Sequence, residues 1–313
     1  MTSDVVASQV DPLAFDWASG TGPAAEVRRV VEGAAAADGR SPLDEAALLG
    51  LRHHGLDGAS LYVVENADLD PAVMGFAVVH AGGSTQESAD LNLVVAPEYR
   101  RMGIGTALGR AVIASSDSPV AAWAHGNHPG AAALAGTLGF DRVRDLWLMR
   151  RSLVDPLPPL RVIDGVDVRT FRPGVDDADF LRVNAAAFAH HPEQGRMTQA
   201  DLDARIAEDW FDPGGFFLAV SAADGALLGF HWTKVHPTDP PVGEVYVVGV
   251  APGAQGSGLG KLLTLTGLHH LQARGLDEVI LYVEADNAAA VAVYEGLGFR
   301  HAPADTDVMY LRR

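Results

Sequence analysis

The chain of 313 residues contains no cysteine. That absence excludes a disulfide framework, a thiolate metal site and a cysteine nucleophile. The chain also has no run of about 20 apolar residues, so we expect no transmembrane helix and no role in a membrane. The first residues lack the basic-then-apolar pattern of a signal peptide, and we expect a cytoplasmic protein.

Positive charge is scarce as well. The net charge is −17, and Lys234 and Lys261 are the only lysines. Such a balance argues against nucleic-acid binding, which depends on neutralising phosphates. It suits a cationic substrate, although a surface adapted for solubility is the favoured explanation. Apolar residues make up 48 % of the chain, which is ample for two cores, and domains of about 150 residues are typical.

A repeated segment is the most informative feature present. Residues 93–106 and 248–261 each lead from a valine-rich stretch into a Gly-x-Gly sequence, with Gly103 and Gly258 standing 155 positions apart. A Leu-Gly-Phe unit follows each copy. The chain is therefore interpreted as a tandem duplication.

Three prolines between residues 152 and 160 indicate an interdomain linker, because proline denies a segment helix and ladder hydrogen bonds. We predict a first domain over 1–154, a linker over 155–160 and a second domain over 161–313. A monomer is expected, because a tandem already supplies two domains.

The same order of elements is predicted for both halves. In the first half, helices are expected at about 24–37 and 43–53, strands at 59–65, 73–81 and 89–96, a helix at 104–115, a strand at 120–125, a helix at 129–137 and a closing strand at 141–151. The second half repeats them at 175–189, 198–208, 215–221, 226–236, 244–251, 259–273, 279–284, 288–296 and 305–312. Each half should be an α/β (α+β) domain with a mixed, mostly antiparallel sheet flanked by helices.

The glycine-rich loops predict two anion sites. Glycine lets the backbone adopt positive φ and approach a ligand closely. The first N–H groups of the following helix are unpaired, and the helix dipole favours an anion such as a pyrophosphate. Neither loop is a P-loop, and neither fits a Rossmann fingerprint in spacing or position.

At these residues the chain resembles the GNAT family of N-acetyltransferases. The signature Gln/Arg-x-x-Gly-x-Gly/Ala is matched by 100–105 and 255–260, and the family's downstream Asn-x-x-Ala-x-x-x-Tyr pattern by 287–299. The resemblance implies that acetyl-CoA is the co-substrate, without a metal. In the first half it would be bound by Leu93, Val94, Val95, Arg101, Met102, Gly103, Ile104, Gly105 and Thr106. In the second half it would be bound by Val248, Gly249, Val250, Gln255, Gly256, Ser257, Gly258, Leu259, Gly260, Lys261, Asn287, Ala288, Ala289, Ala290, Val291 and Ala292.

Direct acetyl transfer from a thioester needs a deprotonated amine, a donor to the oxyanion and a proton for the leaving thiolate. Glu244, at the start of the strand that leads to the loop, is predicted to bind the substrate ammonium and to act as the general base. Tyr294 is predicted to protonate the leaving sulfur, and a backbone N–H near Val248 to bind the oxyanion. A solvated strand end and a packing residue are the alternatives for Glu244 and Tyr294.

The first half is expected to lack these groups. The offset of 155 residues places Ala89 opposite Glu244, and alignment of the Leu-Gly-Phe units places Ala135 opposite Tyr294. We therefore predict that the first domain binds acetyl-CoA without turnover.

Several strings resemble one actinobacterial subgroup of tandem GNAT enzymes, among them 191–195 and 229–236. This subgroup acetylates the cysteinyl amine of a cysteine–glucosamine–inositol conjugate. The resemblance implies that Glu45, Glu193, Lys234 and Tyr282, together with Glu244, contact that substrate.

Other interpretations remain open. A related tandem enzyme could acetylate an aminoglycoside or a protein N-terminus, and an acetyl-CoA sensor without turnover is a third possibility, although Glu244 and Tyr294 speak against it. A metal site is not expected, because His231 and His236 stand five residues apart on one predicted strand and so face opposite sides.

Overall fold

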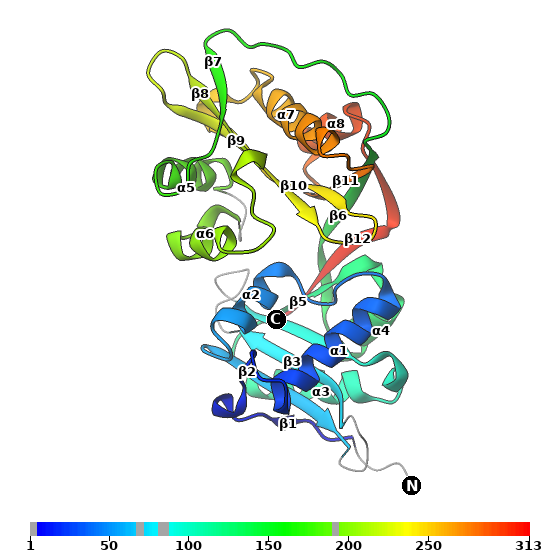
Figure 1. The fold of residues 1–313 in the computed structure, drawn as a ribbon. Coiled ribbons are helices and arrows are strands. Elements are labelled where there is room, and N and C mark those ends of the chain that lie inside the picture. The colour runs from blue at the N-terminus through cyan, green and yellow to red at the C-terminus, as the bar shows by residue number, and fades with distance from the viewer. Residues whose placement is uncertain (1–4, 67–71, 81–87, 190–193) are drawn as a thin grey trace. The chain divides into compact units, whose positions relative to one another are not determined.

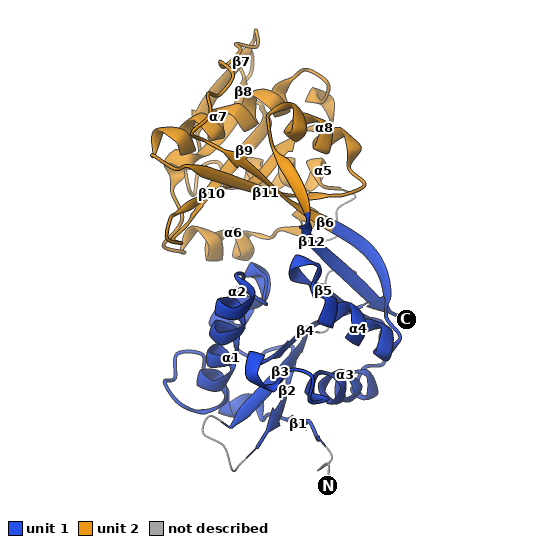
Figure 2. Ribbon diagram, turned by 90° about the vertical axis from the view of Figure 1, so that its right-hand side faces the viewer, with its two compact units in different colours: residues 1–145, 303–313 blue, residues 146–302 orange. Residues whose placement is uncertain are grey.

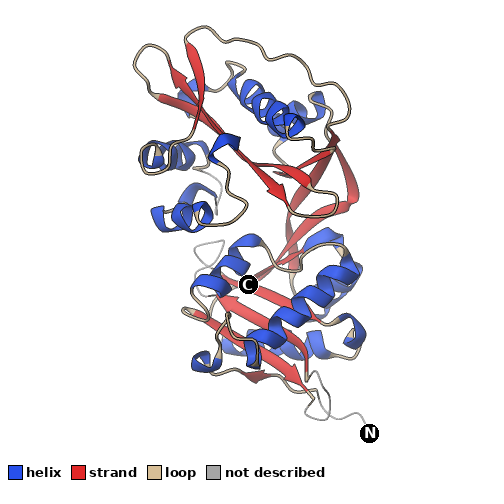
Figure 3. Ribbon diagram, viewed as in Figure 1, coloured by secondary structure: helices blue, strands red, loops and turns tan. Residues whose placement is uncertain are grey.

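The computed structural model describes residues 5–66, 72–80, 88–189 and 194–313. It divides into two compact units: unit 1 comprises residues 1–145 and 303–313, and unit 2 comprises residues 146–302 (Figure 2). Each unit is built around its own set of strands, with helices packed on both faces (Figure 3). The predicted fold class, two tandem α/β domains with mixed sheets, is confirmed.

Unit 1 has the strand order β1-β2-β3-β4-β5-β12 (Figure 1). All neighbouring strands paired within this order run antiparallel except β4 and β5, which are parallel. Its elements are β1 (Ser8–Gln9), α1 (Gly22–Asp38), α2 (Glu45–His53), β2 (Ala59–Glu65), β3 (Val73–His80), β4 (Ala89–Val95), α3 (Ile104–Ser115), β5 (Val120–Ala124), α4 (Pro129–Leu138) and the main part of β12 (Arg300–Arg312).

Unit 2 has the strand order β6-β11-β10-β9-β8-β7, in which only β10 and β11 are parallel. Its elements are the main part of β6 (Asp141–Ser152), β7 (Val166–Thr170), α5 (Asp177–Ala187), α6 (Gln199–Ile206), β8 (Phe216–Ser221), β9 (Leu227–His236), β10 (Val242–Val250), α7 (Leu259–Ala273), β11 (Glu278–Glu284) and α8 (Ala288–Gly296). The predicted elements are therefore present in both halves, and β7 and the two-residue β1 are additions.

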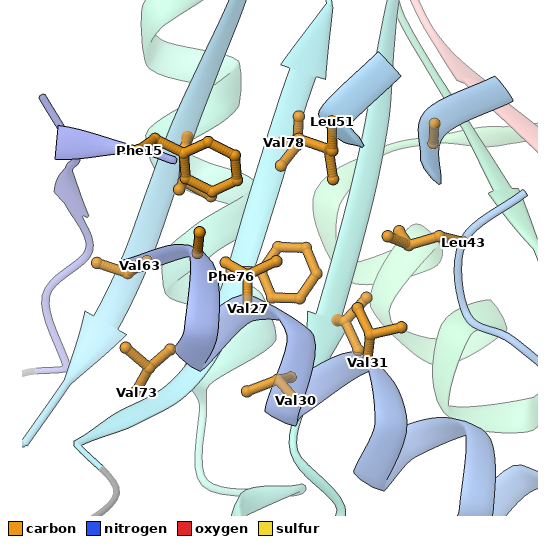
Figure 4. Close-up of a cluster of buried hydrophobic side chains, with 14 of the residues drawn as sticks. Phe15, Val27, Val30, Val31, Leu43, Leu51, Val63, Val73, Phe76 and Val78 are labelled. Carbon is orange, nitrogen blue, oxygen red and sulfur yellow. The ribbon is translucent and has the colours of Figure 1, made fainter. Parts of the chain in front are cut away.

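The core of unit 1 shows why α1 forms where it does. Val27, Val30 and Val31 recur at helical spacing and pack against Phe76 of β3 (Figure 4). Full burial of one such valine contributes about 1.5–3 kcal/mol. The helix ends at Gly39, whose φ of 74° places it in the left-handed conformation that glycine adopts without strain.

The corresponding face of unit 2 is aromatic. Phe180 of α5 packs edge-on against Phe216, Phe230 and Trp232 of strands β8 and β9. Trp232 also stacks on Phe216, with ring centroids 4.6 Å apart. Helices α5 and α6 therefore cover one face of this sheet, and the opposite face packs against α7 and α8.

The closing strands do not complete the sheets that precede them in the sequence. Residues 146–152 of β6 pair with β11 of unit 2, and residues 308–312 of β12 pair with β5 of unit 1. Each half was predicted to be closed by its own final strand, and that prediction is wrong. The boundaries of the compact units consequently fall within β6 and β12 rather than at the linker predicted over 155–160.

Asp307 anchors the returning strand β12 in unit 1. Its buried carboxylate accepts hydrogen bonds from Arg40, His125 and the backbone N–H of Gly126 at 2.8–3.1 Å. Burial raises the pKa of Asp307, but the hydrogen bond and charge of His125 and the charge of Arg40 outweigh burial and hold that pKa below its usual value. A charged, fully bonded carboxylate therefore attaches the chain's last strand to the first unit.

Candidate active site

Strands β10 and β11 of unit 2 separate along their length. Residues 243–245 pair with 279–281, but the ladder stops there, although β10 continues to Val250 and β11 to Glu284. On the other side, β10 remains paired with β9 as far as Val250. In this described part of the sheet, the β10 backbone over 247–250 thus has no strand partner on its β11 side. Such backbone groups can bind an extended polar ligand.

A β-bulge lies at the point of separation. The β9–β10 register shifts between Val245 and Val247, so Tyr246 is an extra residue. Its hydroxyl accepts a hydrogen bond from Arg205 Nε of α6 at 2.9 Å. The bulge therefore changes the direction of β10 next to the opening, and the hydrogen bond from Arg205 connects it to α6.

The glycine-rich loop leads into the start of α7, where the sequence predicts an anion site. Gly256 and Gly258 have φ values of 78° and 85°, and Gly258 is the N-cap of α7 without any side-chain cap. The first N–H groups of α7 therefore carry no capping side chain, as a pyrophosphate site requires. The side-chain amide of Gln255 donates to the carbonyl of Val250 at 3.3 Å and closes the loop on the strand.

Asn287 begins α8 as its N-cap. Its side-chain oxygen accepts a hydrogen bond from the backbone N–H of Ala290 at 3.1 Å. The asparagine of the predicted motif thus has a structural task at the head of the helix that carries Tyr294. Residues 288–292 form the first turns of α8, directly after the end of β11.

Glu244 is buried on β10, with 6 % of its surface exposed. Its Oε2 atom lies 2.7 Å from Nε2 of His236, on β9. Lys234 is directly opposite Glu244 in the β9–β10 ladder, so the two side chains share one face of the sheet. This is the face that α5 and α6 cover. A lone buried carboxylate is costly, and the bond from His236 offsets part of that cost.

His236 contacts the predicted base Glu244, a position for which the sequence did not single it out. His231 and His236, two residues of β9 that a shared metal would need on one side, point to opposite faces of the sheet, as predicted. His231 lies under α7, with Nδ1 2.7 Å from the carbonyl of Leu263, and burial lowers its pKa to about 4. The sequence did contain a signal for this position. Lys234 and His236 are two residues apart on one strand, so both side chains lie on the face of Glu244.

Lys234 sits against aromatic rings. Its ammonium lies 4.3 Å from the ring centroid of Trp210 and 5.2 Å from that of Tyr246. Cation–π contacts of this kind orient a lysine at the edge of an apolar site. Lys234, a predicted substrate residue, therefore lies beside Glu244. The sequence did not predict its aromatic neighbours.

The other predicted substrate residues are dispersed. Tyr282 on β11 is 40 % exposed and stands two residues after Ile280, the ladder neighbour of Glu244, so it shares the same face. Glu45 is the first residue of α2 in unit 1. Glu193 lies outside the described residues.

Tyr294 comes from the opposite side of the sheet. It packs on Phe299, with ring centroids 5.9 Å apart, and joins the apolar cluster that contains Val245 and Leu281. Burial raises the pKa of its phenol to about 12, which keeps the hydroxyl protonated at neutral pH. Glu244, the predicted base, and Tyr294, the predicted proton donor, thus lie on opposite faces of the sheet that opens between β10 and β11.

Unit 1 repeats the frame of this site. Its parallel ladder joins only residues 89–91 to 120–122, and α3 begins at Gly103, with φ of 84° and no side-chain cap. Arg100 takes the place of Gln255, donating to the carbonyl of Val95 at 3.3 Å, and also forms a bidentate pair with Asp38. The residues predicted to bind acetyl-CoA in the first half therefore line a comparable strand, loop and helix start.

The predicted match between Ala89 and Glu244 is wrong. In the parallel ladders, Asp90 pairs with Ala121 as Glu244 pairs with Ile280, and these partners are equivalent in the alignment that matches Phe140 with Phe299. The antiparallel ladders agree, because Asp90 is opposite His80 and Glu244 is opposite Lys234. The bulge at Tyr246 adds one residue to β10. The offset of 155 residues between equivalent positions of the two halves therefore holds after Tyr246 but not before it.

The predicted correspondence between Ala135 and Tyr294 agrees with the structure. His128 caps α4 through Nδ1 at 3.1 Å as Asn287 caps α8, and both stand seven residues before the compared position. Unit 1 therefore has a carboxylate at the position of the base and no side chain with a proton at the position of the acid.

Replacement of His236 tests whether it positions Glu244. We expect His236→Leu to lower kcat by about 10- to 100-fold, because a hydrogen bond to a charged group contributes about 1.5–3 kcal/mol, and to leave the KM for acetyl-CoA unchanged. His236→Gln retains an N–H donor and should recover most of the rate. Steady-state kinetics of both variants checks this, and equal losses in the two would contradict a positioning role.

Comparisons with known proteins agree with this geometry. The sequence model of the acetyltransferase (GNAT) family matches residues 31–140 and 184–299. The chain belongs to this family and is a tandem acetyltransferase. It is 54 % identical to the mycothiol acetyltransferase of Nocardioides sp. over 302 residues, covering 92 % of this chain and 97 % of the relative. It is 52 % identical to the mycothiol acetyltransferase of Nocardia farcinica, covering 91 % and 92 %.

Solved structures support the same fold. A tandem GNAT protein from the clavulanic acid biosynthesis pathway superposes with a TM-score of 0.68 at 21 % identity, covering 92 % of this chain and 94 % of that one. A GCN5-related N-acetyltransferase from Sphaerobacter thermophilus superposes with a TM-score of 0.67 at 23 % identity, covering 98 % and 95 %. Among the described residues, no helix combines the length and apolar content needed to cross a bilayer.

Proposed function

We propose that the protein transfers the acetyl group of acetyl-CoA to the cysteinyl amine of desacetylmycothiol, the cysteine–glucosamine–inositol conjugate, and so forms mycothiol. Support comes from identities of 50 % or more to mycothiol acetyltransferases that match almost the whole chain. The observation that carries the proposal is the buried Glu244, bonded to His236 and facing Lys234 beside the opening in the sheet.

Glu244 performs the first task, which is to prepare the amine. An α-ammonium has a pKa near about 8 and no lone pair while charged. The buried carboxylate binds this group and takes its proton, with His236 holding the Oε2 atom in place. Lys234 donates to hydroxyl oxygens of the sugar or inositol, and Tyr282 presents a half-exposed ring on the same face. Glu193 and Glu45 belong to this proposal as further substrate contacts.

The strand and loop hold the co-substrate. Residues 248–250 offer a strand edge without a partner strand on the β11 side to a pantetheine arm, and residues 256–261 offer glycine backbone and helix N–H groups to a pyrophosphate. These features fit acetyl-CoA, which supplies an activated thioester when bound. A backbone N–H next to the bulge, near Val248, serves as the oxyanion donor.

Tyr294 performs the last task. Its phenol is held neutral by burial and donates a proton to the departing thiolate. In unit 1 the corresponding position is Ala135, so we propose that this unit binds acetyl-CoA but contributes little to turnover.

A thiol-release assay tests the function. The purified chain, acetyl-CoA and desacetylmycothiol should give a saturable release of CoA, with tobramycin and a peptide N-terminus as parallel acceptors. A rate with tobramycin or the peptide and none with desacetylmycothiol would overturn the proposal. Release that is independent of every acceptor would indicate thioester hydrolysis and would count against it equally.

A further inference from the structure

One arginine side chain attaches helix α6 to the bulge of β10. The Nε atom of Arg205 donates to the Tyr246 hydroxyl at 2.9 Å, and its Nη1 atom donates to the carbonyl of Asp201, one turn earlier in α6, also at 2.9 Å. The start of this helix is fixed as well, because Thr198 and Asp201 form a reciprocal capping box. Arg205 therefore holds the Tyr246 hydroxyl from a helix whose own end is hydrogen-bonded.

The ring of Tyr246 meets the ring of Trp210 at an angle of 60°, with the centroids 5.1 Å apart. Both rings pack on the buried Trp232, at centroid distances of 5.3 and 5.6 Å. The ammonium of Lys234 lies against both of them, 5.2 Å from the centroid of Tyr246 and 4.3 Å from that of Trp210. Because an ammonium is attracted to an aromatic face, the direction of the Lys234 side chain depends on where Tyr246 is held.

The backbone of Tyr246 has a second effect on the site. Tyr246 is the first residue of β10 beyond the ladder with β11, and it is the extra residue of the β9–β10 register. A bulge sets the local direction of its strand, so the placement of Tyr246 also aims the N–H groups that follow it. One of these, near Val248, is the proposed oxyanion donor. Tyr246 thus connects the proposed substrate lysine to the strand edge proposed for the thioester.

We propose that Arg205 and Tyr246 are positioning residues for acetyl transfer. Arg205 holds Tyr246, and Tyr246 in turn holds both the Lys234 ammonium and the bulge that follows Glu244. This inference rests on the function proposed for unit 2 and extends its site from β9 and β10 to the covering helix α6. Neither residue exchanges a proton with the substrate, and each acts through the groups that it holds.

Steady-state kinetics of Tyr246 variants is the first test. Tyr246→Phe retains the ring but loses the bond from Arg205, so kcat should fall by about 10-fold, as for loss of a hydrogen bond to a charged group. The KM for desacetylmycothiol should stay within about twofold, because the ring still faces Lys234. Tyr246→Leu also removes the ring and should raise this KM by about 10-fold, with the KM for acetyl-CoA unchanged in both variants. An unaltered kcat in Tyr246→Phe would overturn the proposal.

A double-mutant cycle tests whether Arg205 acts through the Tyr246 hydroxyl. Arg205→Met should lower kcat by about 10-fold, and the double variant with Tyr246→Phe should lose no more than either single variant. Arg205→Lys retains a donor and should recover part of the rate. The matched control is Arg182→Met, since Arg182 is an exposed arginine of α5 paired with Asp179, and it should retain full activity. Losses that multiply in the double variant would overturn the proposal.

The scarcity of lysine permits a test that does not depend on turnover. Lys234 and Lys261 are the only lysines, so selective isotope labelling of lysine gives two side-chain resonances, which Lys261→Arg assigns. Ring currents of Trp210 and Tyr246 should shift the Lys234 protons upfield, and Arg205→Met should reduce this shift, whereas Arg182→Met should not. If Arg205→Met does not fold, as judged by circular dichroism, Arg205→Lys and Tyr246→Phe replace it.

The same spectra separate this proposal from the function of unit 2. A Lys234 resonance that is identical in the unaltered chain and in the Arg205 variants would overturn the positioning role. A Lys234 resonance that responds to Arg205, in a chain that shows no turnover of desacetylmycothiol, would support the link from α6 to Lys234 and count against the proposed substrate alone.

Discussion

Glu244→Gln should lower kcat for desacetylmycothiol by about 10³-fold, since general-base catalysis contributes about 10²–10⁴-fold. The amide preserves the size of the side chain and can still bond His236, but it cannot accept the ammonium proton. Acetyl-CoA binding should stay within about twofold, because its proposed contacts are the β10 backbone and the loop over 255–261.

Rapid-quench kinetics and calorimetric titration with acetyl-CoA would measure the two quantities separately. Glu278→Gln is the matched control, because this glutamate is on β11 of the same unit, forming a surface ion pair with Arg150. It should retain full activity, since an exposed pair contributes only about 0–1 kcal/mol. Equal losses of turnover and acetyl-CoA affinity in Glu244→Gln would contradict the assignment of Glu244 as the base.

Tyr294→Phe should lower kcat by about 10²-fold, as expected for removal of a general acid. The ring contact with Phe299 remains, so the variant should fold with nearly unchanged stability. Because burial raises the pKa of Tyr294 to about 12, the acid stays protonated throughout the neutral and moderately alkaline range. The rate of the unaltered enzyme should therefore show no decline from Tyr294 until the pH approaches that value.

Alkaline unfolding offers a measurement of Tyr294 that does not depend on activity. The folded pKa is above the ordinary value of 10.0, so the folded chain retains a proton that the unfolded chain loses. Tyr294 should contribute stability that is fully present below pH 10 and is lost as the pH rises towards 12. In Tyr294→Phe this dependence should be absent, as determined by denaturant titrations at successive pH values. An identical alkaline decline in both proteins would show that the phenol is not buried as described.

Much of the fold was predictable because each local sequence pattern favours one kind of secondary structure. Helix α7 begins at Leu259, as expected from the uncapped glycine loop, and ends at Ala273. Strand β2 occupies 59–65, where residues 61–64 form a short apolar run of the length typical of a buried strand. The position of Glu244 before the loop likewise indicated a catalytic carboxylate, because the strand, loop and helix follow one another directly in the sequence.

Pairing between distant segments was not predictable in the same way. The closing strands β6 and β12 each contain an apolar stretch, at residues 146–149 and 308–311, and such a local pattern does not say which sheet the strand joins. The choice depends on contacts far apart in the chain, such as the bonds of Asp307 to Arg40 and His125. Only the folded structure shows that the two closing strands are exchanged.

By itself the sequence determined the duplication, the elements of each half, the two glycine loops and the likeness to acetyltransferases, because these depend on residues that are neighbours in the chain. The tertiary structure decided which side chains meet. It placed His236, on β9, beside Glu244, on the neighbouring strand β10. Because β10 contains one bulged residue, Tyr246, the residue of unit 1 that corresponds to Glu244 is Asp90 rather than Ala89. A bulge changes register by one position, and in a sheet one position reverses the face on which a side chain lies.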